Sequence, residues 1–178
     1  MVMARISKYL RWIFFLMVLA LMLSSCGSQR KKYLSQVTPI VEQNDMLDAR
    51  VAELPKVNAF KDSDYLMKLD SYIAAKKAML TRIEALEPPF MLSATHTKLI
   101  QAMNNGIRYL QSEREKFVIA QEQMSKTPTS GRTEDEIIQE YYSQTAAYQA
   151  DMKEQLMKQQ YERLYEEVKD ELERARRL

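Results

Sequence analysis

The chain has 178 residues, of which only three are glycine and five are proline, and strong helix formers dominate it. No stretch alternates apolar and polar residues at the two-residue period of a strand, which excludes a β fold and predicts an all-α protein. The 26 basic and 24 acidic residues nearly balance, and no recognisable motif accompanies them, so nucleic-acid binding is not expected.

The N-terminal residues have the three parts of a secretory signal. Three basic residues precede an unbroken apolar run at 12–23, and two serines follow as a small-residue cleavage site. The run of about twelve residues is shorter than the stretch of about 20 that a transmembrane helix needs. We therefore expect residues 1–25 to be a cleaved signal peptide.

Leu23-Ser24-Ser25-Cys26 resembles the lipobox of bacterial lipoproteins, in which a diacylglyceryl group is attached to the cysteine sulfur before the leader is cut. The resemblance implies lipid attachment at Cys26 and a location outside the cytoplasm, on the plasma membrane or on the outer membrane of a Gram-negative cell. Gly27, where an aspartate would mark retention at the inner membrane, favours the outer one. The alternative is an uncleaved signal anchor with a free cysteine. Because Cys26 is the only cysteine, no internal disulfide can form.

Without the leader, 23 basic and 24 acidic residues remain, so the mature chain is close to neutral. Residues 26–32 are expected to form a short lipidated tether, and residues 33–178 to form one domain. The basic residues Arg30, Lys31 and Lys32 either dock on anionic lipid or belong to an ordinary solvated tether.

The domain is predicted to be an up-and-down bundle of about four helices. The first helix is expected from near Lys32 to Val51 or Leu54. Pro39 either kinks this helix or lies in the first turn of its main portion. Its apolar stripe consists of Leu34, Val37, Val41, Leu47, Val51 and Leu54.

The second helix is expected from about Ser63 to Leu86, where Pro88 and Pro89 reverse the chain. Its buried stripe is predicted to be Leu66, Leu69, Ile73, Leu80 and Ile83. The residues predicted to lie largely outside that stripe are Lys68, Asp70, Lys76, Lys77 and Arg82.

The third helix is predicted to continue through Asn104-Asn105-Gly106, although this tripeptide is also typical of a turn. The helical interpretation is preferred because the apolar residues on both sides stay on one face. Gly106 then allows a neighbouring helix to approach closely. The stripe comprises Leu92, Leu99, Met103, Ile107, Leu110, Phe117 and Met124.

Thr133 and Glu136 form a capping box that predicts the start of a fourth helix at 133–178, long enough to outreach its partners. A first stripe runs through Ile138, Tyr141, Thr145, Tyr148 and Met152. A second, in shifted phase, runs through Tyr161, Tyr165, Val168, Leu172 and Ala175. The second stripe either packs on the first helix or extends as a short coiled coil with a second copy or a partner.

No constellation for catalysis, cofactor binding or metal binding is recognised. His96, the only histidine, lacks a neighbouring nucleophile or ligand set and is expected to pack or to bond a backbone carbonyl. The carboxylates do not repeat as Glu-x-x-His, and those around Glu171 are expected to form a solvated face.

The expected function is therefore a non-catalytic structural or protein-interaction role at the membrane. An envelope protein or a second copy would bind through the 133–178 helix. The alternative is a binding protein that holds an apolar ligand or peptide between helices lined by methionines and by Tyr141, Tyr148 and Tyr161. The Leu86-Glu87-Pro88-Pro89 corner followed by His96 looks like the helical ectodomains of some bacterial lipoproteins, a likeness that implies no activity.

Overall fold

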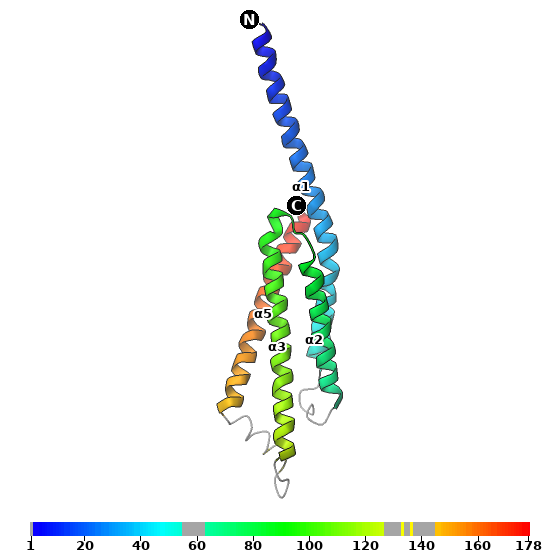
Figure 1. Cartoon of the computed structure of the whole chain (residues 1–178), viewed down its shortest axis with the longest axis vertical. Coiled ribbons are helices and arrows are strands. Elements are labelled where there is room, and N and C mark those ends of the chain that lie inside the picture. Colours follow the sequence, from blue (N-terminus) through cyan, green and yellow to red (C-terminus); the bar gives the residue numbers. More distant parts are fainter. Residues whose placement is uncertain (1, 55–62, 127–132, 134–135, 137–144) are drawn as a thin grey trace.

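The computed structural model describes residues 2–54, 63–126, 133, 136 and 145–178. Within these ranges side chains are described from residue 27 onward, except at 63, 120–121, 123–126 and 145–150. Helices α1, α2, α3 and α5 and one short 3-10 helix, η2, are the elements in these ranges, residue 136 is also helical, and no strand occurs there. The chain runs up and down between the helices, so the predicted all-α bundle is confirmed (Figure 1).

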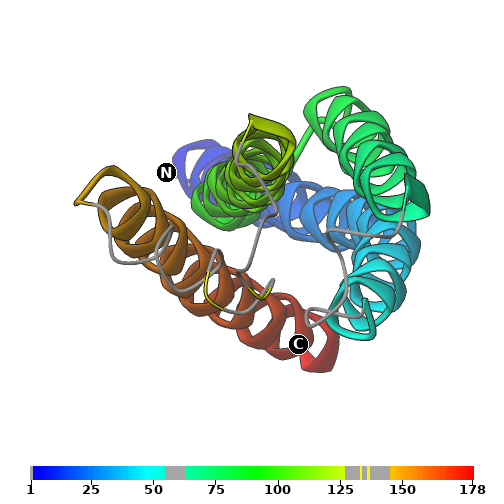
Figure 2. The same ribbon diagram turned by 90° about the horizontal axis from the view of Figure 1, so that it is seen from below.

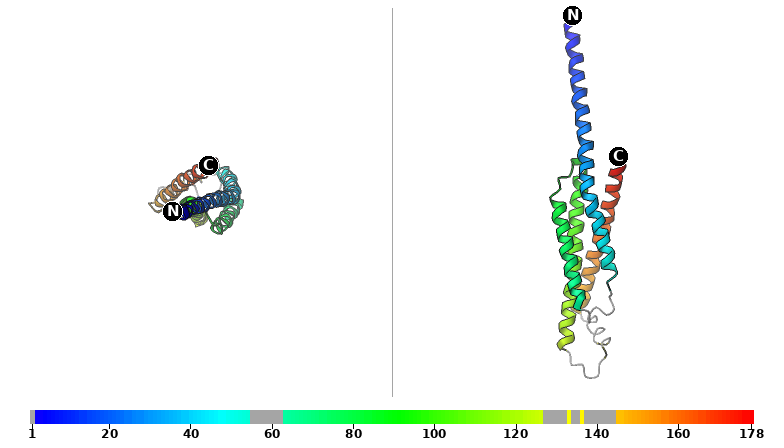
Figure 3. Two further views of the ribbon diagram at one scale, coloured as in Figure 1. Left: turned by 90° about the horizontal axis from the view of Figure 1, so that it is seen from above. Right: turned by 90° about the vertical axis from the view of Figure 1, so that its right-hand side faces the viewer.

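Helix α1, Val2–Ala52, extends far beyond the other helices at its N-terminal end (Figures 1 and 3). The expected start near Lys32 is wrong, because the backbone stays helical through the predicted leader and through residues 26–32. Pro39 is the first proline of the chain, so no proline interrupts the helix before it. Pro39 does not open the helix either, since α1 continues through it. Among the helices that the structure describes, none is both long enough and apolar enough to cross a membrane.

The middle of the chain follows the sequence prediction closely. Helix α2 spans Ser63–Glu84, and the Pro88-Pro89 corner leads into η2, Phe90–Leu92. Helix α3 spans Ser93–Lys126 and is continuous through Gly106, as predicted.

Helix α5, Thr145–Arg177, has 33 residues and is therefore no longer than α3, which has 34. The predicted overhang of the last helix depends on residues 133–144, most of which lie outside the described residues. Within the described part of the chain, the element that outreaches the bundle is α1. One half of the predicted capping box is present, because the backbone N–H of Thr133 donates to Glu136 Oε2 at 2.9 Å. Most of the first predicted stripe lies outside the described side chains, and its last member, Met152, is exposed.

Each helix packs against two antiparallel neighbours, in the order α1, α2, α3, α5 and back to α1, and the α3–α5 contact is the most extensive (Figure 2). The core has two clusters along the bundle axis, one around Val37, Leu99 and Val168 and one around Leu69 and Leu110. All five residues of the second stripe of α5 are buried in the first cluster. The Tyr165 hydroxyl also donates to the backbone carbonyl of Val41 at 2.9 Å, so this stripe packs on α1.

Candidate functional site

Cys26, the predicted lipid attachment residue, lies on α1 just outside the bundle; its side chain is outside the described residues. Tyr33 is the first buried residue of the described part of α1. Tyr33 follows Cys26 by seven residues, which corresponds to about 10 Å along the helix axis at 1.5 Å per residue. A Cβ added at Gly27 would meet no atom within 4 Å, so a group attached at this point has free space.

A cluster of polar side chains lies inside the bundle, where the sequence predicted none. It consists of Asn44 and Asp48 on α1, Lys76 on α2 and Tyr161 on α5. Lys76 and Asn44 are each 1% exposed, so the expectation that Lys76 lies outside the stripe is wrong. This residue fills the gap between Ile73 and Leu80, which completes a regular three-four spacing on the buried face of α2.

The cluster satisfies its own hydrogen bonds. The Lys76 ammonium donates to Asn44 Oδ1 at 2.7 Å, to Asp48 Oδ1 at 2.7 Å and to the Tyr161 hydroxyl at 3.0 Å, which uses all three of its protons. Asn44 Nδ2 donates to Asp48 Oδ2 at 2.9 Å and to the Tyr161 hydroxyl at 2.8 Å. Tyr161 in turn donates to Asp48 Oδ2. Burial of this ion pair is tolerable because every donor of the ammonium and of the amide has an acceptor.

Burial changes the acidity of the groups in the cluster. It lowers the pKa of Lys76, an effect that the neighbouring Asp48 carboxylate opposes. It raises the pKa of the Tyr161 hydroxyl far above its ordinary value, and the charge of Asp48 raises it further. The tyrosine therefore stays protonated, and its hydroxyl remains a donor to Asp48.

A surface pocket of about 340 Å³ opens between α1, α3 and α5 beside this cluster. Its walls hold the carboxylates of Asp45, Asp48, Glu162 and Glu166, the ammonium groups of Lys158 and Lys169, and the tyrosines 109, 161 and 165. No methionine is among the described residues that line it. Of the three tyrosines predicted to line a ligand site, Tyr161 lies in this pocket, while the side chains of Tyr141 and Tyr148 are outside the described residues.

The charges at the rim of this pocket are already paired. Lys169 lies 2.6 Å from Glu166 and 3.6 Å from Asp45, and its ammonium also sits 5.2 Å from the centroid of the Tyr165 ring. Lys158 lies 3.9 Å from Glu162. A ligand with a positive charge could replace either lysine against these carboxylates and rings.

His96 lies at the corner between η2 and α3, where it is 8% exposed. The Tyr33 hydroxyl is 2.9 Å from its Nδ1, and the two rings are in edge contact with centroids 5.8 Å apart. His96 is thus packed, which was one of the two expectations, and its hydrogen bond is made to a side chain of α1 and not to a backbone carbonyl. Burial lowers the pKa of His96 below its ordinary value.

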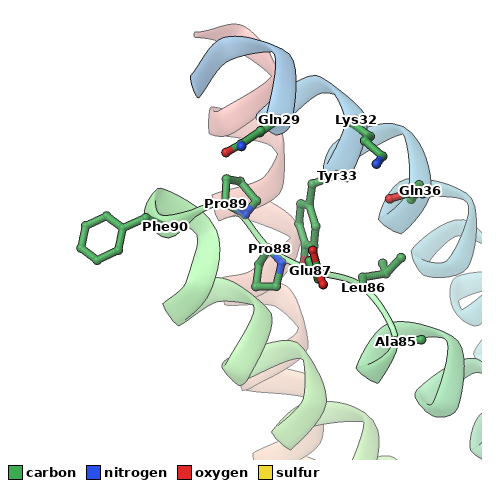
Figure 4. A pocket seen from close by; sticks show the side chains of 10 residues that line it. All are labelled: Gln29, Lys32, Tyr33, Gln36, Ala85, Leu86, Glu87, Pro88, Pro89 and Phe90. Atoms are coloured by element: carbon green, nitrogen blue, oxygen red, sulfur yellow. The ribbon is translucent and has the colours of Figure 1, made fainter. Parts of the chain in front are cut away.

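A second pocket, of about 510 Å³, lies between α1 and the segment that connects α2 to η2 (Figure 4). Gln29, Lys32 and Tyr33 line it from α1, and residues 85–90 line it from the corner. The Phe90 side chain points away from the pocket into solvent.

Glu171, assigned by its sequence context to a solvated face, instead connects two helices. Its carboxylate accepts from Lys98 Nζ at 2.7 Å and from the Thr95 hydroxyl at 2.6 Å, both on α3. These bonds lower the pKa of Glu171. Among the described residues no group of three or more His, Cys, Asp or Glu side chains is arranged to hold a metal ion.

Comparison of the chain with known protein families, with curated proteins and with solved structures found no match. The function must therefore follow from the residues of this chain.

Proposed function

We propose that the protein is a lipoprotein held at a membrane surface outside the cytoplasm by lipid on Cys26, and that its bundle has a non-catalytic structural or protein-interaction role. The observation that carries this proposal is the Leu23–Cys26 motif, which lies directly before the point where α1 enters the bundle. Two acyl chains on one residue give the stable attachment that a single chain cannot. Cleavage before Cys26 would remove only the part of α1 that projects from the bundle.

The interior of the bundle supports a structural role. Its one deeply buried ammonium group, among the residues with described side chains, donates to three acceptors of the chain itself. Such a network fixes the helices relative to one another and presents no free base or nucleophile to a substrate.

The outer face of α5 supports an interaction role. Met152 and Leu156 are 49% and 55% exposed, and residues four apart lie next to each other on a helix. Because the second stripe of α5 is used in the core, a partner protein or a second copy would bind on this outer patch.

Metabolic labelling with radioactive palmitate tests the lipid attachment. The wild type and Ser25→Ala, which keeps a small residue before the cleavage point, should take up label into a shortened chain. Cys26→Ala should take up none and keep its leader. Uptake of label by Cys26→Ala would contradict the assignment of Cys26.

Site-directed photocrosslinking in cells tests the interaction role. A crosslinker at Leu156 should yield a discrete heavier band. The control position is Gln155, which is also exposed but lies about 100° away around the helix. Absence of an adduct at Leu156, or equal adducts at both positions, would count against a specific partner on this face.

The pocket beside Tyr161 supports a second candidate function, binding of a small ligand. Its volume of about 340 Å³ is in the range of ligand sites, which begins near 300 Å³. Its charged walls favour an apolar molecule with a cationic end over the purely apolar ligand expected from the methionines. An alkylamine and an alkylcarboxylate of equal chain length are the matched probes. Tyrosine fluorescence should respond to the amine alone; no response to either would remove this function.

A further inference from the structure

Three segments far apart in the sequence converge at the end of the bundle from which α1 projects. The corner at residues 87–91 lies against α1, because Pro88, Pro89 and Gln29 line the same pocket (Figure 4). The C-terminus of α5 lies there too, where Arg176 donates to the Thr38 hydroxyl at 2.5 Å (Figures 1 and 3). We call this end of the molecule the α1 exit face.

Large apolar side chains are exposed on the α1 exit face. Phe90 is 95% exposed, Met91 is 64% exposed and Leu178 is 80% exposed. The residues beside them hold the corner in place, since Pro89 is buried and Leu92 is 6% exposed. Phe90 and Met91 are therefore presented to solvent by a fixed turn, although removing either side chain from water would be favourable.

Basic residues lie on the two helices that meet at this face. Helix α1 contributes Arg30, Lys31 and Lys32, and the last turn of α5 contributes Arg174, Arg176 and Arg177. The described acidic residues near them include Glu87, Glu171 and Glu173; Glu171 interacts with Arg174, and Glu173 is paired with Arg177 at 2.5 Å. An excess of positive charge near exposed apolar side chains complements an anionic lipid surface, which attracts basic residues that lie close to the bilayer.

The position of Cys26 fixes what lies opposite this face. Gln29, which lines one pocket with Phe90, follows Cys26 by three residues, or about 4.5 Å along the helix. A lipid on Cys26 would hold Cys26 at the level of the lipid headgroups. The corner at residues 87–91 would then lie close to the headgroups as well.

We propose that the α1 exit face docks on an anionic bilayer, with Phe90 and Met91 inserted among the headgroups. The bundle then stands on the membrane in a fixed orientation with the distal ends of α2 and α3 away from it. This inference rests on the proposed lipid attachment at Cys26, which brings the face to the bilayer but does not by itself insert the corner.

A single tryptophan in the full processed chain, reconstituted into vesicles, tests the docking. The processed chain has no native tryptophan, because Trp12 lies in the leader, and Met91→Trp is compared with Met67→Trp. Both methionines are 64% exposed, but Met67 lies near the start of α2, toward the distal end. In phosphatidylglycerol-rich vesicles, Trp at position 91 should emit at shorter wavelength and be quenched by brominated lipid. Trp at position 67 should show neither change.

Lys31→Gln combined with Lys32→Gln should reduce the lipid quenching at position 91, because two of the attracting charges are lost. Uncharged phosphatidylcholine vesicles should also give less quenching at position 91, because the anionic lipid is then missing.

The possible failures are distinguishable. A chain that lacks the acyl mass and does not float with vesicles would remove the proposed anchor. A lipidated chain that floats, but whose Trp at position 91 behaves like that at position 67, would overturn the docking alone. Protection of position 91 from aqueous iodide without quenching by brominated lipid would also overturn it, since a protein would then cover the corner.

Discussion

Lys76 of α2 and Tyr161 of α5 meet inside the bundle, with Nζ 3.0 Å from the hydroxyl oxygen and 4.6 Å from the ring centroid. Asn44 and Asp48 of α1 complete the contact, so three helices share one polar cluster. An axial slip of any of the three helices would separate donors from acceptors in the low-dielectric core. The cluster therefore fixes the register in which the apolar stripes pack.

Replacing Lys76 by Met should lower the free energy of unfolding by about 2–3 kcal/mol, because the Asp48 carboxylate loses its counterion. The loss is below that for a fully buried pair, since the Asp48 side chain is 31% exposed and keeps two donors. Urea unfolding followed by circular dichroism measures it. Lys77→Met is the matched control, because Lys77 is exposed next to Lys76, and it should change stability by no more than about 0.5 kcal/mol.

Gly106→Ala should destabilise the bundle although alanine favours a helix by about 1 kcal/mol. The added Cβ would lie 3.0 Å from Tyr161 Cε2 and 3.1 Å from Cδ2, and the hydrogen bonds of the hydroxyl prevent this ring from moving away. We expect a net loss of about 1 kcal/mol from overpacking. In a Tyr161→Leu background the same substitution should become stabilising. An equal effect in both backgrounds would mean that the ring does not restrict position 106.

Stability should fall steeply above pH ~10, the ordinary pKa of tyrosine. Burial raises the pKa of Tyr33 to about 12 and raises those of Tyr109, Tyr161 and Tyr165. In the unfolded chain these groups ionise near pH 10. Their stabilising contribution is thus complete below that pH and is lost as pH rises toward the folded-state values.

Ultraviolet titration of tyrosinate measures this effect. Ionisation of these four tyrosines should coincide with loss of helix, whereas ionisation near pH 10 with the helices intact would contradict their burial. Lys76 has the opposite effect on the pH dependence of stability. Because its pKa is lowered in the folded state, its contribution to stability increases as pH rises toward the ordinary lysine pKa of about 10.4. Lys76→Met removes this contribution, so the loss of stability at alkaline pH should begin at a lower pH.

His96 should titrate below pH 6.5 in the folded protein, because burial disfavours the imidazolium. The unfolded state binds this proton more readily, so stability should decline as pH falls below 6.5. The single histidine gives one resolved proton NMR signal for the titration. Tyr33→Phe removes the hydrogen bond to Nδ1 and should cost about 1 kcal/mol, while the apolar ring contact is kept. A His96 midpoint at or above 6.5 would show that the ring is solvated.

The sequence was sufficient for the helices whose apolar stripes are uninterrupted. The three-four spacing around Leu99, Met103, Ile107 and Leu110 outweighed the turn propensity of Asn104-Asn105-Gly106, and the close approach predicted at Gly106 is made by Tyr161. At Pro88 and Pro89 the prediction also holds, because a residue before proline is driven out of the helical region.

The polar cluster was missed because a lysine was assumed to be exposed. The helical spacing did indicate burial, because Lys76 on α2 and Asn44 on α1 both fall on the buried faces of their helices. What the sequence does not reveal is the partner, because the acceptors of Lys76 lie 28 to 85 residues away along the chain. The start of α1 was missed for another reason. The polar residues 24–32 reduce helix propensity but contain no residue that stops a helix.

Lipid attachment at Cys26 is the central claim, and the mass of the native protein tests it most directly. Intact and N-terminal peptide mass spectrometry of material extracted from the membrane should find a chain that begins at Cys26 and carries a diacylglyceryl group on the sulfur. A chain that begins at any other residue, or an unmodified Cys26 thiol, would contradict the account.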